Sequence, residues 1–211
     1  MAKQAAKRAR SPWMHEHLND AYVKQAQSAG YRSRAAYKLL EIAKADRLLR
    51  PGLAVVDLGA APGSWSQVVA AAVGRTGTVV AVDLLEIPSI AGVHFLQGDL
   101  RTGETLARVD AALQGRPVDL VLSDMAPNLS GVASTDQARH RELCEQALVF
   151  ATDHLKPGGA FLIKAFQGSG YPEFLRLIKQ SFESVVSRKP AASRDRSAEM
   201  YLLGKGFRAV R

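Results

Sequence analysis

Residues 55–67, VVDLGAAPGSWSQ, decide the fold of this 211-residue chain. Val55 and Val56 suit a strand that is buried on both faces, and Pro62-Gly63 opens the helix that follows the loop. In open α/β sheets, ligands bind at the carboxyl ends of the strands, where this loop would lie. The stretch therefore predicts a ligand-binding connection, although a plain strand-to-helix turn would use the same glycines.

The spacing of the glycines separates the ligands that such a loop could hold. Gly59 and Gly63 form G-x-x-x-G, whereas a dinucleotide pyrophosphate requires G-x-G-x-x-G and a nucleoside triphosphate requires G-x-x-x-x-G-K-[ST]. Neither phosphate fingerprint is present in the loop. Small residues would instead let the backbone approach a compact ligand, such as the amino-acid part of S-adenosylmethionine.

The pattern of residues changes at Pro51-Gly52, and strands and helices alternate after it. The predicted strands are 54–58, 78–83, 93–97, 118–123, 159–166, 182–188 and 199–204. The predicted helices are 16–27, 33–46, 64–73, 102–113, 134–155 and 171–181. This order predicts an α/β fold with a mostly parallel seven-stranded sheet, helices on both faces and an antiparallel last strand that inserts next to its neighbours. We divide the chain into an appendage, residues 1–50, and a core domain, residues 51–211.

Composition limits the class of protein. A content of 47% hydrophobic residues is enough for a core. No apolar run reaches the roughly 18 residues of a membrane-spanning helix, and MAKQAAKRAR lacks the apolar segment of a signal peptide, so we expect a cytoplasmic protein with no membrane partner. The single cysteine, Cys144, cannot form an internal disulfide, and we expect it in the core. The histidines lack ligand spacing, so we expect no metal.

Basic residues are unevenly placed along the chain. Lysine and arginine outnumber aspartate and glutamate by 28 to 20, and most of the excess lies in residues 1–38. Such a patch indicates a polyanionic partner, although a solvated tail would account for residues 1–11 alone. In YRSRAAYKLLEI, Arg32, Arg34 and Lys38 are interleaved with tyrosines, which suits phosphate contact and base stacking. We predict that these three residues bind RNA.

Three acidic residues follow successive predicted strands, and we expect them at one edge of the sheet. Asp83 stands where an acid can accept hydrogen bonds from both ribose hydroxyls of a nucleoside. Asp99 would lie beside the adenine, and the ring of Trp65 would cover apolar parts of the pocket. Asp124 is the third acid. Each of the three could instead be a helix cap or a loop carboxylate.

Lys164 is the strongest catalytic candidate. It is the one charged residue in the otherwise apolar strand 159–166, where a buried ammonium group needs partners or a function. Asp124 and Glu199 could supply the partners. The alternative interpretation is a salt-bridge cluster with a structural role, because some charged clusters stabilise the fold and take no part in function.

With these residues in view, the chain resembles the FtsJ/RrmJ (RlmE) family of ribosomal RNA large subunit 2′-O-ribose methyltransferases over nearly all of its length. The resemblance depends on RSRAAYKL, VVDLGAAPGSWSQ, FLQGDL, SDMAPNLSG, KAFQG and RKPAASRDRSAEMY. It implies that the family's catalytic Lys-Asp-Lys-Glu set corresponds to Lys38, Asp124, Lys164 and Glu199. It also implies S-adenosylmethionine contacts at Gly63, Trp65, Asp83, Asp99 and Asp124. Ser64 departs from the glycine that is common in the family.

The resemblance carries further expectations. It implies a Rossmann-like S-adenosylmethionine-dependent methyltransferase fold over residues 51–211 and an RNA-facing appendage over residues 1–50. The reaction would be attack of a ribose 2′-oxygen on the sulfonium methyl group of S-adenosylmethionine, with Lys164 orienting the 2′-hydroxyl and accepting or relaying its proton. The implied substrate is a uridine in the A loop of 23S rRNA, within the large ribosomal subunit. We expect a monomer.

Three alternatives are distinguishable. A base N-methyltransferase should carry N/D-P-P-[YF], whereas this chain has Asp124-Met125-Ala126-Pro127. A relative that acts on transfer RNA or on a messenger cap would share the chemistry but not the substrate. A non-catalytic RNA-binding or ribosome-assembly factor could keep the fold, but it would have no need of an intact lysine and acid set.

Overall fold

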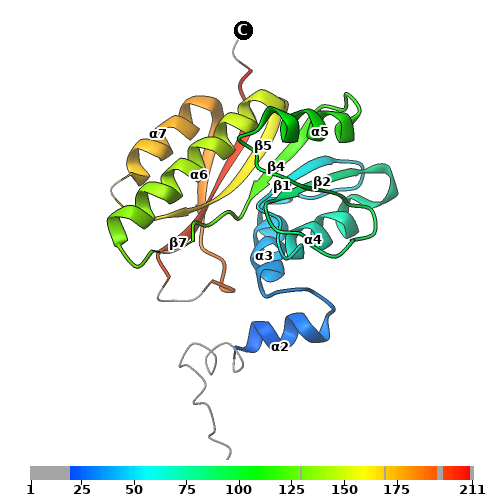
Figure 1. Cartoon of the computed structure of the whole chain (residues 1–211), viewed down its shortest axis with the longest axis horizontal. Helices are drawn as coiled ribbons and strands as arrows, with labels where there is room; N and C mark the ends of the chain where they lie inside the picture. Colours follow the sequence, from blue (N-terminus) through cyan, green and yellow to red (C-terminus); the bar gives the residue numbers. More distant parts are fainter. Residues whose placement is uncertain (1–19, 129, 169, 194–196, 210–211) are drawn as a thin grey trace, which may run out of the picture.

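The computed structural model describes residues 20–128, 130–168, 170–193 and 197–209. A sheet of seven strands lies between two layers of helices (Figure 1), in the order β3-β2-β1-β4-β5-β7-β6. The strands are β1 (Ala54–Leu58), β2 (Thr78–Asp83), β3 (His94–Gln97), β4 (Val118–Ser123), β5 (Leu155–Phe166), β6 (Phe182–Arg188) and β7 (Glu199–Phe207). The helices are α2 (Ala21–Ser28), α3 (Ala35–Asp46), α4 (Ser64–Val73), the 3₁₀ turn η1 (Gly74–Thr76), α5 (Gly103–Leu113), α6 (Ala133–His154) and α7 (Tyr171–Ser181).

The predicted sheet is confirmed. Strands β1 to β5 all run parallel to one another. Strand β7 lies between β5 and β6 and runs antiparallel to both. Every residue of β1 is buried, as expected for a central strand that is covered on both faces.

Two apolar clusters hold the three layers together. One joins the sheet to α5, α6 and α7 and includes Cys144, which is buried as predicted. The other joins the opposite face of the sheet to α3 and α4, and it includes Leu39 and Ile42 of α3. Helix α3 is therefore part of the main core, and the division of the chain at residue 51 stays a prediction.

Helices α3, α5 and α6 and strand β3 differ from their predicted boundaries by one or two residues, and α2, β5 and β7 differ by more. The predicted helix 16–27 begins at Ala21 in the structure, because Asp20 caps it by accepting a hydrogen bond from the Tyr22 amide; residues 16–19 lie outside the described residues. Strand β5 begins at Leu155, four residues early, because the Pro-Gly-Gly stretch lies in a register irregularity inside the strand and not in a turn before it.

Strand β7 continues three residues beyond its predicted end. A Cβ on Gly204, the last residue of the predicted strand, would lie 2.7 Å from the ring of Phe182. The glycine thus makes room for an aromatic ring from the neighbouring strand, and strand pairing continues to Phe207.

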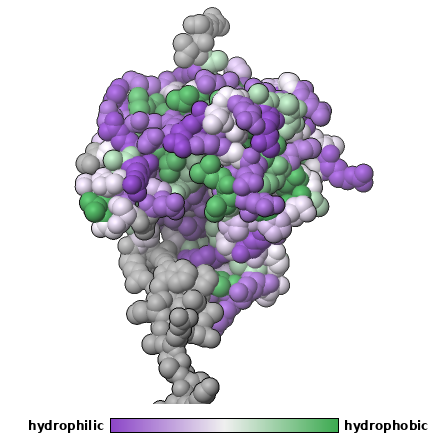
Figure 2. All heavy atoms as spheres, viewed as in Figure 1, coloured by the Kyte–Doolittle hydropathy of each residue, from purple (hydrophilic) through white to green (hydrophobic). Residues whose placement is uncertain are grey.

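The surface mixes polar and apolar groups. Hydrophilic residues dominate the face shown in Figure 2, and apolar residues form small separate groups on it. Within the described part of the chain, no helix combines the length and the apolar character needed to cross a bilayer.

A carboxyl group is buried in the centre of the sheet. Asp57 of β1 is fully buried, and its Oδ2 accepts a 2.6 Å hydrogen bond from Ser66 of α4. Its Oδ1 has no hydrogen-bond partner among the described residues. Burial, together with the charges of Asp124 and Asp83, raises the pKa of Asp57 to about 7 and outweighs the hydrogen bond from Ser66, which lowers it.

We expect the substitution Asp57→Asn to flatten the pH dependence of stability. In the unfolded chain the carboxyl group titrates near pH 3.8, so its contribution to stability is complete below that pH and is lost as the pH rises through 7. Between pH 5 and pH 8 the free energy of unfolding of the natural protein should fall by about 2–3 kcal/mol more than that of the variant. Urea unfolding across this pH range measures the difference, and parallel profiles would contradict it.

Candidate active site

The glycine-rich loop between β1 and α4 lies close to the segment that follows β4. Gly59 has a φ of 72°, and a Cβ built on it would lie 2.4 Å from Cγ of Met125 and 3.1 Å from its Cα. Gly63 has a φ of 100°, and a Cβ built on it would lie 2.7 Å from Cδ1 of Ile90 and 2.8 Å from Nη1 of Arg32. Both positions therefore require glycine, because a side chain would be strained and would collide with its neighbours.

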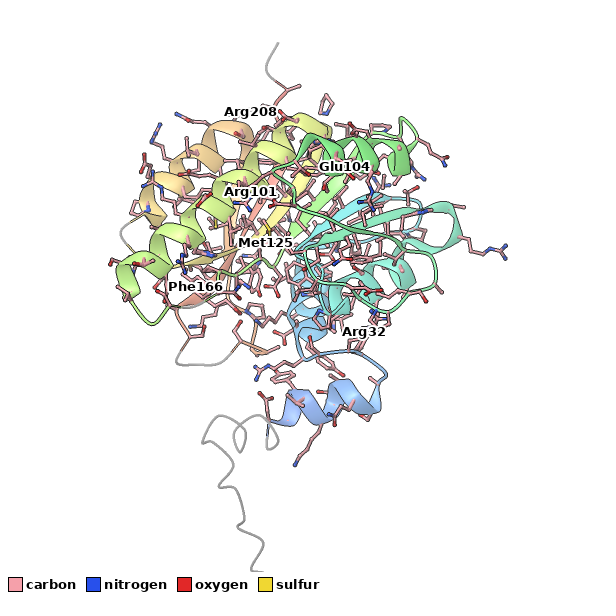
Figure 3. The ribbon with its side chains drawn as sticks, viewed as in Figure 1. Arg32, Arg101, Glu104, Met125, Phe166 and Arg208 are labelled. Atoms are coloured by element: carbon pink, nitrogen blue, oxygen red, sulfur yellow. The ribbon has the colours of Figure 1, made fainter. Side chains whose placement is uncertain are left out.

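A cavity of about 680 Å³ opens at the carboxyl ends of β1, β2, β3 and β4. Asp83, Asp99 and Asp124 all line it, so the structure brings the three predicted acids together. Met125, labelled in Figure 3, lies at its wall. Helix α6 lines the remaining side through Arg139, Glu142, Leu143 and Gln146.

Two of these carboxylates also organise the loops around the cavity. Asp83 accepts hydrogen bonds from the backbone amides of Ala61 and Leu85, each at 2.8 Å. Asp99 forms an ion pair with Arg101 at 2.5 Å, and the hydrogen bonds from Arg101 lower the pKa of Asp99. Each oxygen of Asp83 accepts one hydrogen bond and can accept a second from a ligand, whereas both oxygens of Asp99 already face two donors of Arg101, so a ligand at Asp99 would take the place of one of these contacts.

Trp65 does not lie as the sequence analysis expected. Its ring is 3% exposed and packs 5.7 Å from the ring of Tyr201 in the core. Its indole nitrogen donates a 2.8 Å hydrogen bond to the carbonyl of Ala35. The expectation that the ring covers the pocket is therefore corrected: Trp65 fastens α4 to α3. Neither Trp65 nor Gly63 is among the lining residues of the 680 Å³ cavity.

Lys164 and Asp124 form an ion pair next to this cavity. Strands β4 and β5 pair in parallel with Ser123 opposite Ile163, so the next residues, Asp124 and Lys164, are neighbours. The ammonium of Lys164 lies 3.1 Å from Asp124 Oδ1 and donates a 2.5 Å hydrogen bond to the Asp124 carbonyl. Lys164 is only 6% exposed. Its three N–H donors thus have two partners among the described residues, and one direction is left for a substrate oxygen.

Lys38 and Glu199 form the second ion pair of the site. Lys38 extends from α3, and its Nζ lies 2.6 Å from Glu199 Oε1. Ser193 donates a 2.9 Å hydrogen bond to the same carboxylate oxygen. Both charged side chains are nearly buried, so the structure brings together all four residues of the predicted catalytic set.

Tyr201 links the two ion pairs, and the sequence analysis missed it. Antiparallel pairing of β5 with β7 places Tyr201 opposite Lys164. Its hydroxyl donates a 2.8 Å hydrogen bond to Asp124 Oδ1, and Lys38 Nζ lies 5.8 Å from the centre of its ring. Burial, followed by the charges of Asp124 and Glu199, raises the pKa of Tyr201 well above its usual value, so the hydroxyl stays protonated as a donor. The sequence offered one signal for Tyr201: it lies two residues after Glu199, at the polar start of a mostly apolar strand.

The two arginines predicted to bind RNA contact the protein itself. Arg32 donates hydrogen bonds to the carbonyls of Pro62 at 2.9 Å and Ser89 at 3.0 Å (Figure 3). Arg34 forms an ion pair with Asp20 and donates to the carbonyl of Ala192. The contact of Arg32 with Pro62 holds the segment before α3 against the glycine-rich loop, and Arg34 joins the start of α3 to Asp20 and Ala192. RNA binding by Arg32, Arg34 and Lys38 stays a prediction.

Ser64, the departure from the family's glycine, fits the site. Its side chain is 2% exposed, and its hydroxyl lies 2.7 Å from that of Ser33. The added hydroxymethyl group therefore joins the first turn of α4 to the start of α3. Within the described ranges, no group of three or more His, Cys, Asp or Glu side chains is arranged to hold a metal ion.

The fold and the site define a class of protein. A 3-2-1-4-5-7-6 sheet with an antiparallel seventh strand, acids at the ends of its parallel strands and a loop without a phosphate fingerprint are the features of a Rossmann-like methyltransferase.

Comparisons with known proteins give the family. The family model described as FtsJ-like methyltransferase matches residues 31–207, and the chain belongs to this family. A protein of Thiobacillus denitrificans named "Ribosomal RNA large subunit methyltransferase E" is 61% identical over 195 residues, which are 92% of this chain and 89% of that protein. Proteins with the same name are 61% identical in Azoarcus sp., over 93% of this chain and 96% of that protein, and 56% identical in Neisseria gonorrhoeae, over 93% and 95%.

Solved structures agree on the fold. A Plasmodium falciparum protein described as a ribosomal RNA methyltransferase superposes with a TM-score of 0.75 at 29% identity, over 86% of this chain and all of that one. A protein from Clostridium thermocellum has a TM-score of 0.57 at 19% identity, over 81% of this chain and 97% of that one, and it shows the fold alone. The expectations of a methyltransferase, and of the FtsJ/RrmJ family, are confirmed.

We predict that Tyr201→Phe lowers the free energy of unfolding by about 1–2 kcal/mol, because the partly buried carboxylate of Asp124 loses a donor. The matched control is Tyr171→Phe, whose hydroxyl makes only an exposed 3.4 Å contact with Ser187 and whose loss should change stability little. Chemical unfolding of both variants measures the difference. Equal effects would show that the Tyr201 hydroxyl does not support the site.

Proposed function

We propose that this methyltransferase transfers a methyl group from S-adenosylmethionine to the 2′-oxygen of a uridine ribose in the A loop of 23S rRNA. The observation that carries the proposal is the network of Lys38, Glu199, Tyr201, Asp124 and Lys164 at the edge of the 680 Å³ cavity. Asp124 belongs to both the network and the cavity wall, so a bound cofactor and a bound ribose would meet at this residue.

The cavity suits a cationic nucleoside better than a phosphate-bearing cofactor. Four carboxylates line it, against the two guanidinium groups of Arg101 and Arg139, and this excess of negative charge would repel a pyrophosphate but attract a sulfonium and an α-amino group. Asp83 would hold the ribose through its remaining lone pairs, and Asp99 would accept a hydrogen bond from the adenine in place of one from Arg101. The loop at Gly59 and Gly63 would pass close to the amino-acid part. When bound, S-adenosylmethionine supplies an electrophilic methyl carbon.

In the proposed reaction, the catalytic residues align the ribose 2′-oxygen with the methyl group and remove the proton of the 2′-hydroxyl. The remaining direction of Lys164 faces the 2′-hydroxyl and orients it. As the neutral amine, Lys164 accepts the hydroxyl proton through its lone pair; as the ammonium it can only relay the proton, with one of its own protons passing to the Asp124 carboxylate as the hydroxyl proton arrives. Asp124 positions Lys164 through two contacts, while Lys38 and Glu199 help to place the ribose. Alignment of this kind can supply a large share of the rate enhancement, because it removes translational and rotational freedom before the reaction.

Ribosomal RNA as substrate is supported by the names of the relatives and by charge. Proteins 56–61% identical to this chain are named for the large ribosomal subunit, and the net charge of +8 favours a polyanion. We infer that the protein acts on the large subunit as a monomer in the cytoplasm. Residues 1–50, which carry most of the excess positive charge, would face the RNA.

Transfer of a labelled methyl group tests the proposed function. The protein is incubated with methyl-labelled S-adenosylmethionine and undermodified large ribosomal subunits, with transfer RNA as the parallel substrate. We expect label at a single 2′-O-methyluridine of 23S rRNA, mapped by nuclease digestion and primer extension. Label on transfer RNA alone would show that transfer RNA is the substrate. Bound cofactor without any label would support a non-catalytic role.

We predict that Lys164→Ala and Lys164→Arg each lower the methyl-transfer rate by at least about a hundredfold, the range for loss of a group that transfers a proton. Arginine keeps the charge but neither gives up its proton nor matches the geometry. The control is Lys156→Arg, at the start of the same strand, where the side chain pairs with Asp119. Cofactor affinity should persist in all three variants. Near-normal turnover in either Lys164 variant would remove this residue as the base.

A further inference from the structure

A second cavity, of about 330 Å³, lies between α6, α7 and the end of β5, and we call it the α6–α7 cavity. The proposed function makes no use of it. Helix α6 forms a wall of both cavities, with Gln137, His140 and Cys144 on the α6–α7 side. Pro127, from the segment that follows β4, lines both. The two cavities are therefore neighbours across one helix and one loop.

The α6–α7 cavity lies next to the catalytic network. Ala165 and Phe166, which line it, directly follow Lys164 in β5, and Ala198 directly precedes Glu199. Figure 3 places Phe166 beside the N-terminal half of α6. If one ribose of an RNA chain lies at Lys164, the adjacent nucleotides of that chain would therefore lie close to the opening of this cavity.

The walls of the α6–α7 cavity suit a flat ring. Phe166, Tyr171 and Phe174 contribute aromatic side chains. The ring of His140 stands edge-on to Phe166, with 4.5 Å between the ring centres. Aromatic side chains of this kind are the platforms on which proteins stack unpaired bases.

One buried polar atom points to the chemistry of the ligand. His140 is 6% exposed, and its Nε2 lies 3.3 Å from Cys144 Sγ. Its Nδ1 has no hydrogen-bond partner in the part of the chain that the structure describes. Burial, followed by the charge of Lys164, lowers the pKa of His140 to about 4, so the imidazole is neutral. A neutral ring nitrogen without a partner is costly to bury. Because His140 lines the cavity, a ligand with a polar edge would satisfy Nδ1 once the imidazole turns to present it.

We propose that the α6–α7 cavity is a subsite for one nucleobase of the RNA substrate, belonging to a nucleotide next to the one that is methylated. This inference rests on the proposed function. A base has two apolar faces for the aromatic walls and a hydrogen-bonding edge for His140. Arg141, about half exposed at the rim and paired there with Glu145 and Glu173, lies where the sugar-phosphate backbone would pass. A purely apolar ligand would leave His140 Nδ1 unsatisfied.

Two substitutions on the exposed surface of α6 test the subsite. Ala133 lines the α6–α7 cavity and Ala138 lines neither cavity, although both are exposed on the same helix. We expect Ala133→Trp to obstruct the opening and to raise KM for undermodified large subunits about tenfold, a loss typical of one base stack. Ala138→Trp should leave KM unchanged, and neither variant should change the affinity for S-adenosylmethionine. Equal KM values for the two variants would overturn the proposal.

His140→Phe tests the same subsite from inside. It keeps the aromatic packing but removes the hydrogen-bonding nitrogen, so we expect KM for the subunits to rise about fivefold with kcat and cofactor affinity nearly unchanged. A fall in kcat at unchanged KM would overturn the subsite, because it would place the effect in the catalytic network.

Ultraviolet cross-linking of the natural protein to large subunits identifies the occupant. Cross-links from the peptide that contains Phe166, Tyr171 and Phe174 to 23S rRNA support a base, whereas cross-links to a ribosomal protein overturn it. Absence of methyl transfer by the natural protein would instead defeat the proposed function, so the two failures are distinguishable.

Discussion

Two lysines lie almost buried at the carboxyl edge of the sheet, and the site depends on the two carboxylates that pair with them. An unpaired buried ammonium would cost several kcal/mol, so each lysine needs its acid. Lys164 has Asp124, Lys38 has Glu199, and the hydroxyl of Tyr201 joins the first pair to the neighbourhood of the second. These partners come from α3, β4, β5 and β7, so no single element could build the site.

Single residues serve two purposes at this edge of the sheet. Asp124 pairs with Lys164 and also lines the cavity of the proposed cofactor. Asp83 lines the same cavity and holds the amide of Ala61 in the glycine-rich loop. Close approach of Gly59 to Met125 then brings the loop against the segment that carries Asp124. Cofactor loop and catalytic network are thereby parts of one packed unit.

Regular elements were predictable because their periodicity reflects burial. Helices α4 and α7 begin and end at the predicted residues, since each is bounded by glycine, proline or a strand with a different period. Errors occurred where tertiary packing overrode local signals. Glycine in β7 marks the space taken by Phe182 rather than the end of the strand, and the Pro-Gly-Gly stretch lies inside an irregular β5 because its flanking residues pair with β4.

The candidate site divides in the same way. Positions of Asp83, Asp99 and Asp124 followed from the rule that parallel strands end at one edge. Lys164 followed from its charge in an apolar strand, with Glu199 as a possible partner, and motif resemblance supplied Lys38 as a catalytic residue. The ring of Trp65 was misplaced, because only the packing of α3 on α4 turns it into the core. Tyr201 was missed, because its role depends on cross-strand register.

By itself, the sequence determined the order of strands and helices, the absence of a phosphate fingerprint in the first loop and the residue types available for catalysis, because these depend on local pattern. Tertiary structure alone decided which lysine pairs with which acid, that Tyr201 bonds Asp124, and that a second cavity lies beside the catalytic strand. These are contacts between segments far apart in the chain, and their geometry is set by sheet register and helix packing, which no local pattern encodes.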